Sequence, residues 1–140
     1  ESLSKSLDFI DAQRPPKACV PGKRVFIGEY GFPLESGTTP EIQSQYAQDV
    51  CRAALTWGCP FVLYWEMYCN EIQAEKHRGF WLVDDKNVKQ PFYLWLETYY
   101  RQSKQFVHDF KQTNGRVPTQ DQFTAFALKL FKKEPHARGQ

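Results

Sequence analysis

A glutamate at the end of a predicted strand is the residue of this sequence with the clearest chemical potential. Glu29 closes a four-residue apolar run and lies between Gly28 and Gly31. Glycines on either side of a carboxylate let substrate and backbone approach it closely, because they carry no side chain. A second apolar run ends in Trp65, whose indole offers a large apolar surface. We take these two strand ends as the candidate site, although a solvated loop residue is the simpler interpretation of Glu29.

The two strand ends belong to a predicted strand, helix and strand. Residues 25–28 and 61–65 are continuous apolar runs rich in β-forming residues, which is typical of strands in a parallel sheet. Between them, Thr39 is a good N-cap, Pro40 suits the first helical position and Gly58 stops the helix. The expected apolar face of this helix comprises Ile42, Tyr46, Val50, Ala53, Ala54 and Trp57. The order predicts a βαβ unit with parallel strands and a right-handed crossover.

Three further helices are predicted from the periodicity of apolar residues. The first carries Leu3, Leu7 and Ile10 at helical spacing. A long helix opens at Pro91 and ends at Asn114, and a last helix begins around Pro118. We expect the aromatic stripes of these last two helices to face the core. No apolar stretch approaches the ~18 residues of a membrane span.

The predicted strands are too few to make a stable sheet, since about three or more are needed. Strands this apolar need helices on both faces or a closed barrel around them. The length of 140 residues excludes a complete eight-stranded α/β barrel, which needs about 250. The composition, 41% hydrophobic and 24% charged, excludes disorder of the whole chain. The sequence therefore predicts an α/β fold that needs further strands. Because residue 1 is Glu, we expect a mature product or a piece of a longer protein.

Three short motifs follow one another along the chain: VFIGEYG at residues 25–31, LYWE at 63–66, and GFWLVD at 79–84 with KQP at 89–91. Together they resemble clan-A glycoside hydrolases, the cellulase-like barrels of family 5 and its relatives. The first is similar to their seventh strand, which carries the nucleophile, and the second to their eighth, whose terminal Trp lies beside the sugar. The third is similar to the segment that leads into the last helix. The resemblance covers about residues 3 to 105.

The resemblance implies the C-terminal part of a (β/α)8 TIM barrel. Residues 1–113 would supply strands seven and eight with their helices, and residues 114–140 would form a helical C-terminal extension. Glu29 would be the nucleophile of a retaining glycosidase, which needs a second carboxylic acid about 5–5.5 Å away. That acid comes from the family's fourth strand, which has no counterpart here. We therefore expect an inactive isolated chain, and a parent protein that uses its N-terminal barrel strands to hydrolyse an oligo- or polysaccharide or another glycoside.

Four residues are the predicted substrate contacts in this family context. Trp65 would be a platform for the C–H face of a sugar, and Tyr30 and Tyr68 would donate hydrogen bonds. Asn70 would line the mouth of the barrel. The alternatives are a core tryptophan at residue 65 and ordinary loop polarity at residue 70.

The alternation of side chains along a strand predicts which of them share a face with the site. If Glu29 points into the barrel mouth, the lumen side also receives Val25 and Ile27, and the helix side receives Phe26 and Gly28. If Trp65 faces the lumen, the same side receives Phe61 and Leu63. Glu66 then turns away from the mouth, so Glu29 is the expected catalytic carboxylate.

Metal and cofactor chemistry is not expected from the cysteines and histidines. The cysteines are Cys19, Cys51, Cys59 and Cys69. They form no CxxC pair, and the three histidines lie at no ligand-like spacing beside them. Buried free thiols are the simpler interpretation, and disulfides stay open if the protein is secreted. The compartment is undecided.

Three rival functions are compatible with the same residues. A carbohydrate-binding or regulatory module without catalysis would keep the Trp and Tyr surface. A barrel for phosphorylated substrates fits poorly, because neither strand end offers Lys or a Gly-rich cradle. Residues 101–140 carry eight Lys and Arg against three Asp and Glu, as a nucleic-acid-binding surface would. Their spacing along helices with aromatic opposite faces favours a solvated outer face, so no nucleic-acid partner is expected.

Overall fold

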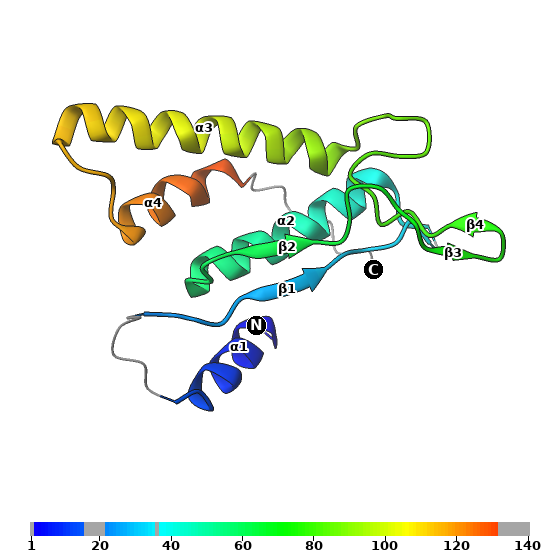
Figure 1. The fold of residues 1–140 in the computed structure, drawn as a ribbon, viewed down its shortest axis with the longest axis horizontal. Helices are drawn as coiled ribbons and strands as arrows, with labels where there is room; N and C mark the ends of the chain where they lie inside the picture. The colour runs from blue at the N-terminus through cyan, green and yellow to red at the C-terminus, as the bar shows by residue number, and fades with distance from the viewer. Residues whose placement is uncertain (1, 16–21, 36, 132–140) are drawn as a thin grey trace, which may run out of the picture. The chain divides into compact units, whose positions relative to one another are not determined.

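The chain combines helices with short strands in the computed structural model, which describes residues 2–15, 22–35 and 37–131 (Figure 1). The elements are α1 (Ser2–Ala12), β1 (Ile27–Tyr30), α2 (Pro40–Trp57), β2 (Val62–Tyr64), β3 (Ile72–Gln73), β4 (Lys76–His77), α3 (Pro91–Asn114), α4 (Gln120–Ala127) and a 3-10 turn (Leu128–Leu130). Cys19 and the C-terminal His136 lie outside the described residues. Two compact units, Glu1–Thr98 and Tyr99–Gln140, divide the chain within α3, whereas the boundary predicted after residue 113 is the end of that helix.

The predicted βαβ unit is present and its two strands are parallel. β1 pairs with β2, and α2 connects them. Ile27 aligns with Val62 and Tyr30 with Tyr64, so β1 spans three residue steps where β2 spans two. This irregularity breaks the alternation of side chains, and it leaves Gly28 and its neighbour Glu29 exposed in succession.

The predicted orientation of the residues before and within β1 is wrong. Val25 is only 8% exposed and packs with Leu7 of α1 and Ala54 of α2, whereas Phe26 is 48% exposed. Ile27 packs against the same cluster as Val25. The prediction assumed regular alternation of side chains along the strand, which would put Val25, Ile27 and Glu29 on the same side. The extra residue in β1 makes that count fail, because Glu29 and Ile27 lie on opposite sides of the strand.

Side chains alternate between the two faces of the sheet along β2 and the residue before it. Phe61 and Leu63 share the exposed face, as predicted, while Val62 and Tyr64 pack against buried clusters. The rings of Phe61 and Phe26 stack with their centroids 4.3 Å apart. The sheet therefore has one face packed against helices and one apolar face that no described element covers.

Helix α2 has the predicted ends and a different buried face. Thr39 accepts a hydrogen bond from the Ile42 amide, and Gly58 closes the helix in the left-handed conformation with φ 92°. Ile42 and Tyr46 are exposed, however, which contradicts the predicted apolar face. The buried residues are Gln43, Ser44, Ala47 and Ala54. The face is partly polar because it meets loop backbone, whose carbonyl groups require hydrogen-bond donors.

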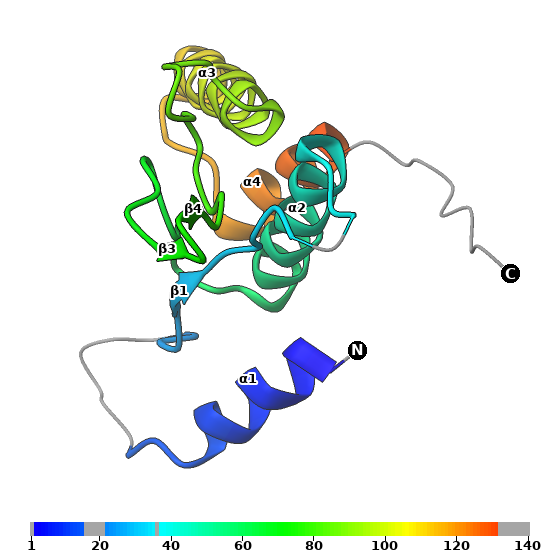
Figure 2. The ribbon, with the colours of Figure 1, turned by 90° about the vertical axis from the view of Figure 1, so that its right-hand side faces the viewer.

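Two clusters of buried residues hold the first unit together. In one, Leu7, Val25 and Ala54 join α1, the start of β1 and α2. The indole nitrogen of Trp57 also donates to Asp8 of α1 at 2.8 Å, so α1 lies near the C-terminal end of α2 (Figure 2). The second cluster comprises Ala47, Leu82 and Phe92. The first turns of α3 thereby close over the same side of the sheet as α2.

A small hairpin, β3 and β4, lies in a segment for which the sequence predicted no strand. Its turn residues, Ala74 and Glu75, both have positive φ values, 49° and 61°. Two-residue hairpin turns of this kind favour Asn and Gly. The sequence therefore lacked the usual signal for this turn.

The second unit comprises the end of α3 and α4, which begins after Thr119 as a capping box with Gln122. Phe106 of α3 stacks on Phe126 of α4 with ring centroids 4.1 Å apart. The prediction that these aromatic stripes pack inward is confirmed. None of the helices in the described ranges has the length and apolar character that crossing a bilayer requires, which agrees with the expected absence of a span.

Candidate functional site

The Glu29 carboxylate lies on the uncovered face of the sheet. Glu29 is the third residue of β1, and the irregularity in this strand turns it away from α2. It is exposed, and it forms no hydrogen bond or ion pair with another described residue. A carboxylate that is not engaged by another described side chain can act as a nucleophile or base towards a bound molecule.

Trp65 is held directly beside the strand that carries Glu29. Its amide donates to the Tyr30 carbonyl at 2.7 Å, which continues the parallel pairing beyond β2. A Cβ atom placed on Gly31 would lie 2.2 Å from the Trp65 carbonyl oxygen. Gly31 is therefore needed for the close approach of the two backbones, while the predicted access of a substrate stays a prediction. The peptide bond between Trp65 and Glu66 is cis.

The indole of Trp65 belongs to a polar network that the sequence did not predict. Its nitrogen donates to Glu71 at 2.9 Å, and Arg78 donates to the other Glu71 oxygen at 3.1 Å. Arg78 also pairs with Glu35, with 2.6 Å between the guanidinium Nε and Oε1. These charged residues lie in three separate loop segments, so no local pattern in the sequence links them.

The Glu35 and Arg78 pair makes one part of the network sensitive to acid. The hydrogen bond from Arg78 holds the pKa of the Glu35 carboxyl below its ordinary value. Its stabilising contribution is thus present above that ordinary value and is lost as the pH falls through the lowered pKa. We expect Arg78→Met to raise the Glu35 pKa in a carbon NMR titration, and Lys89→Met to leave it unchanged. An equal Glu35 pKa in Arg78→Met and wild type would contradict the assigned pair.

The Tyr30 hydroxyl is directed towards α2, and its role as a hydrogen-bond donor to a substrate stays a prediction. Its hydroxyl lies 3.0 Å from the Cys51 sulfur and donates towards the Ala47 carbonyl at 3.4 Å, both on α2. Its ring packs with the buried cluster around Phe92. This orientation follows from the ordinary alternation of side chains, because Tyr30 directly follows the outward-facing Glu29 in the strand.

Tyr68 and Asn70 lie in the loop after β2, and their roles as substrate contacts stay predictions. Tyr68 is 61% exposed and Asn70 is also exposed. The Asn70 amide donates to the Glu66 carboxylate at 3.1 Å. Glu66 therefore fixes the start of this loop, while the side chains of Tyr68 and Asn70 are presented to solvent.

A buried glutamine on α2 supports the loops around the site and was missed by the sequence analysis. Gln43 is 1% exposed, and its amide nitrogen donates to the Phe32 carbonyl at 2.5 Å and the Gly79 carbonyl at 2.7 Å. These carbonyls belong to the loop that leaves β1 and the segment that precedes α3. A polar residue on the buried face of an otherwise amphipathic helix is the one signal that the sequence offered.

We expect Gln43→Met to lower the free energy of unfolding by about 2–4 kcal/mol, because it leaves two buried carbonyl groups unpaired. Urea unfolding followed by circular dichroism measures this loss. Gln48→Met on the same helix removes one hydrogen bond to Ser44, and its expected cost is about 1 kcal/mol or less. Equal losses in the two variants would show that Gln43 does not have this role.

The described cysteines are free thiols, as the simpler interpretation predicted. Cys59 and Cys69 are buried and Cys51 is half-buried. Burial raises the pKa of Cys51 and of Cys59, which keeps both thiols protonated at neutral pH. Within the described ranges, no group of three or more His, Cys, Asp or Glu side chains is arranged to hold a metal ion.

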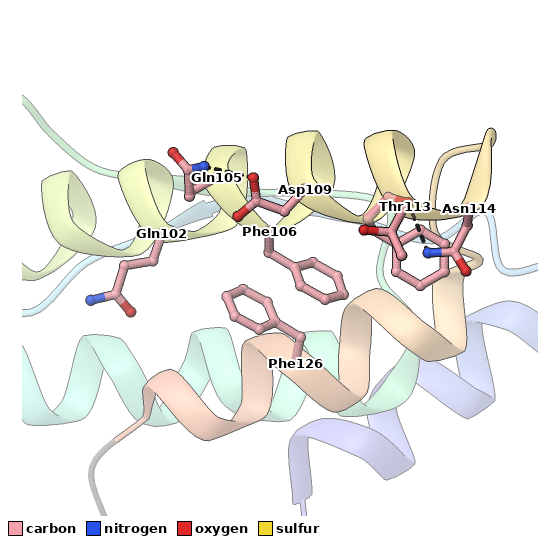
Figure 3. A pocket seen from close by; sticks show the side chains of 8 residues that line it. Gln102, Gln105, Phe106, Asp109, Thr113, Asn114 and Phe126 are labelled. Atoms are coloured by element: carbon pink, nitrogen blue, oxygen red, sulfur yellow. Dashed lines mark hydrogen bonds between the residues drawn. The ribbon is translucent and has the colours of Figure 1, made fainter.

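A separate cavity of about 500 Å³ opens between α3 and α4 in the second unit (Figure 3). Phe106, Phe110 and Phe126 provide its apolar lining. Asp109 is its one lining carboxylate, and it accepts a hydrogen bond from Gln105 at 2.8 Å. The lining of this cavity includes none of the residues at the strand ends that carry Glu29 and Trp65.

Comparisons with family models, with curated proteins and with solved structures find no match to this chain. A proposal about function therefore depends on the geometry of the candidate site. One unpaired carboxylate and one restrained indole lie at the adjacent C-terminal ends of two parallel strands. The parallel pairing thus brings a carboxylate, which can act as a nucleophile or base, and an indole to neighbouring strand ends.

Proposed function

We propose that this chain is the C-terminal part of a (β/α)8 barrel that hydrolyses O-glycosyl bonds with retention of configuration. The observation that carries the proposal is the position of Glu29 and Trp65 at neighbouring C-terminal strand ends. Barrel enzymes keep their chemistry at that end of their strands. The substrate would be an oligo- or polysaccharide or another glycoside, because an indole beside a carboxylate suits the C–H face of a sugar.

The uncovered sheet face supports the barrel part of the proposal. Phe26, Phe61 and Leu63 form an apolar, exposed surface opposite α2. Parallel sheets bury both faces, and a pair of strands lacks the partners that a stable sheet needs. The further barrel strands would cover this face and pair with the free edges of β1 and β2.

In the proposed reaction, Glu29 attacks the anomeric carbon of the substrate. The bond to the leaving oxygen breaks, and a carboxylic acid on another strand of the barrel protonates that oxygen. Water, deprotonated by the same second group, then releases the sugar from the Glu29 ester. Trp65 holds the ring of the sugar during both steps. The described residues supply the nucleophile and the platform and leave the acid/base to the rest of the barrel.

A test of this division compares the 140-residue chain with the complete protein that contains it. We expect no hydrolysis of aryl β-glucosides or β-mannosides by the chain alone. We expect turnover by the complete barrel, with the first-formed product retaining its configuration in proton NMR. An inverted first product, or no turnover of any glycoside in a broad panel, would contradict the proposal.

The second candidate is a carbohydrate-binding or regulatory barrel without catalysis. It is favoured by one observation, namely that the two carboxylates nearest Trp65 are already engaged, Glu66 with the Asn70 amide and Glu71 with the indole nitrogen and Arg78. Such a protein would bind oligosaccharides with equal affinity before and after Glu29→Gln, and it would release no product.

A further inference from the structure

The β3–β4 hairpin is closed at its base by two residues that also contact the candidate site. The Arg78 amide donates to the Glu71 carbonyl at 3.0 Å, which brings the two ends of the hairpin together. The Arg78 carbonyl accepts from the Leu34 amide at 2.8 Å. The hairpin base is thus joined by backbone hydrogen bonds to the loop that leaves β1, the strand that carries Glu29.

The side chains at this base form a continuous chain of contacts to the indole. Each oxygen of Glu71 has its own donor, the Trp65 nitrogen at 2.9 Å and the Arg78 guanidinium at 3.1 Å. Arg78 reaches on to Glu35 with two nitrogens, at 2.6 and 3.4 Å, and its guanidinium lies 4.8 Å from the centre of the Phe80 ring. One oxygen of the Glu71 carboxylate is therefore fixed by Arg78, and the other accepts the hydrogen bond from the Trp65 indole.

We propose that Glu71 is a positioning residue for the sugar platform and that Arg78 ties this platform to the loop after Glu29. This inference rests on the proposed function. The hydrogen bond from the indole nitrogen lies in the plane of the ring, so it restrains rotation of the indole about its bond to Cβ. A restrained ring stacks on a sugar without a further loss of side-chain freedom. The hairpin thereby sets the orientation in which the substrate meets the nucleophile.

The first measurement needs no substrate. Hydrogen exchange of the Trp65 indole N–H, assigned with Trp65→Phe, is followed by NMR in the 140-residue chain. Glu71→Met removes the acceptor, and we expect exchange about tenfold faster or more. Glu75→Met is the matched control, because it removes an exposed carboxylate from the turn of the same hairpin. Equal exchange in wild type and Glu71→Met would overturn the proposal.

The second measurement uses the complete barrel with cellohexaose and mannohexaose as probes. We expect Glu71→Met to raise KM about tenfold with little change in kcat, and Glu71→Gln, which keeps an oxygen acceptor, to recover much of the loss. An unchanged KM despite faster indole exchange would overturn the positioning role. If wild type hydrolyses no glycoside while Glu71→Met still accelerates indole exchange, the proposed function is wrong and Glu71 has no role in positioning a sugar. The hydrogen bond between Glu71 and the indole is then verified on its own.

Discussion

Replacing Glu29 with glutamine is expected to lower turnover by the complete barrel by about 10⁴-fold or more. A carboxamide is neutral and cannot form the glycosyl ester, so the first step of the proposed reaction is lost. The fold should be unaffected, because the exposed Glu29 side chain bonds to no other described residue. Steady-state hydrolysis of an aryl glycoside, with circular dichroism as the check on folding, measures both effects.

Two companion variants make this result specific. Glu75→Gln removes an exposed carboxylate of the hairpin turn and is expected to keep wild-type turnover. In Glu29→Ala, added azide should take the place of the missing nucleophile and yield a glycosyl azide. Wild-type turnover in Glu29→Gln would remove Glu29 from the mechanism. Retained oligosaccharide binding in a wild-type protein that releases no product would favour the non-catalytic barrel.

Replacing Gly31 with alanine is expected to lower the free energy of unfolding by about 3 kcal/mol or more. The new methyl carbon would lie 2.2 Å from the Trp65 carbonyl oxygen and 3.0 Å from the Phe80 ring. The first neighbour is backbone, so it cannot rotate away. Relief requires separation of β1 from the segment after β2, which breaks the hydrogen bond between Tyr30 and Trp65.

Gly28→Ala is the matched control on the same strand. Its methyl carbon would meet the ring of Phe26 at 3.4 Å, which is ordinary contact with a side chain. We expect its stability to change by about 1 kcal/mol or less. Urea unfolding measures the free energy of unfolding of both variants. Equal values for Gly31→Ala and Gly28→Ala would contradict the close backbone approach at Gly31.

The helix ends and the strand order were predictable because local chemistry determines them. Thr39 and Pro40 start α2, Gly58 ends it, and Thr119 caps α4, each by hydrogen bonds or φ angles that act within a few residues. The parallel pairing followed from two apolar runs joined by one helix. The position of Trp65 beside the Glu29 strand followed from the same pairing.

The features that the sequence did not predict depend on contacts between distant segments. The extra residue in β1 carries no sequence signal, yet it reversed the expected sides of Val25 and Ile27. Gln43 is buried because two loops bring carbonyl groups to α2. The link from Glu71 through Arg78 exists only because the β3–β4 hairpin forms, and its turn lacks the residues that usually mark one.

The central claim is that Glu29 becomes covalently bound to a sugar. The 2-fluoro group of a 2-deoxy-2-fluoro-glycosyl fluoride slows both steps, but the reactive fluoride leaving group keeps the first step fast. The ester therefore accumulates and can be found by mass spectrometry. The tryptic peptide of residues 25–52 contains Glu29, Glu35 and Glu41, and fragment ions distinguish these sites. We predict one added fluorosugar on Glu29 and none in Glu29→Gln. Labelling of another residue, or turnover of the reagent with no labelled Glu29, would contradict the account.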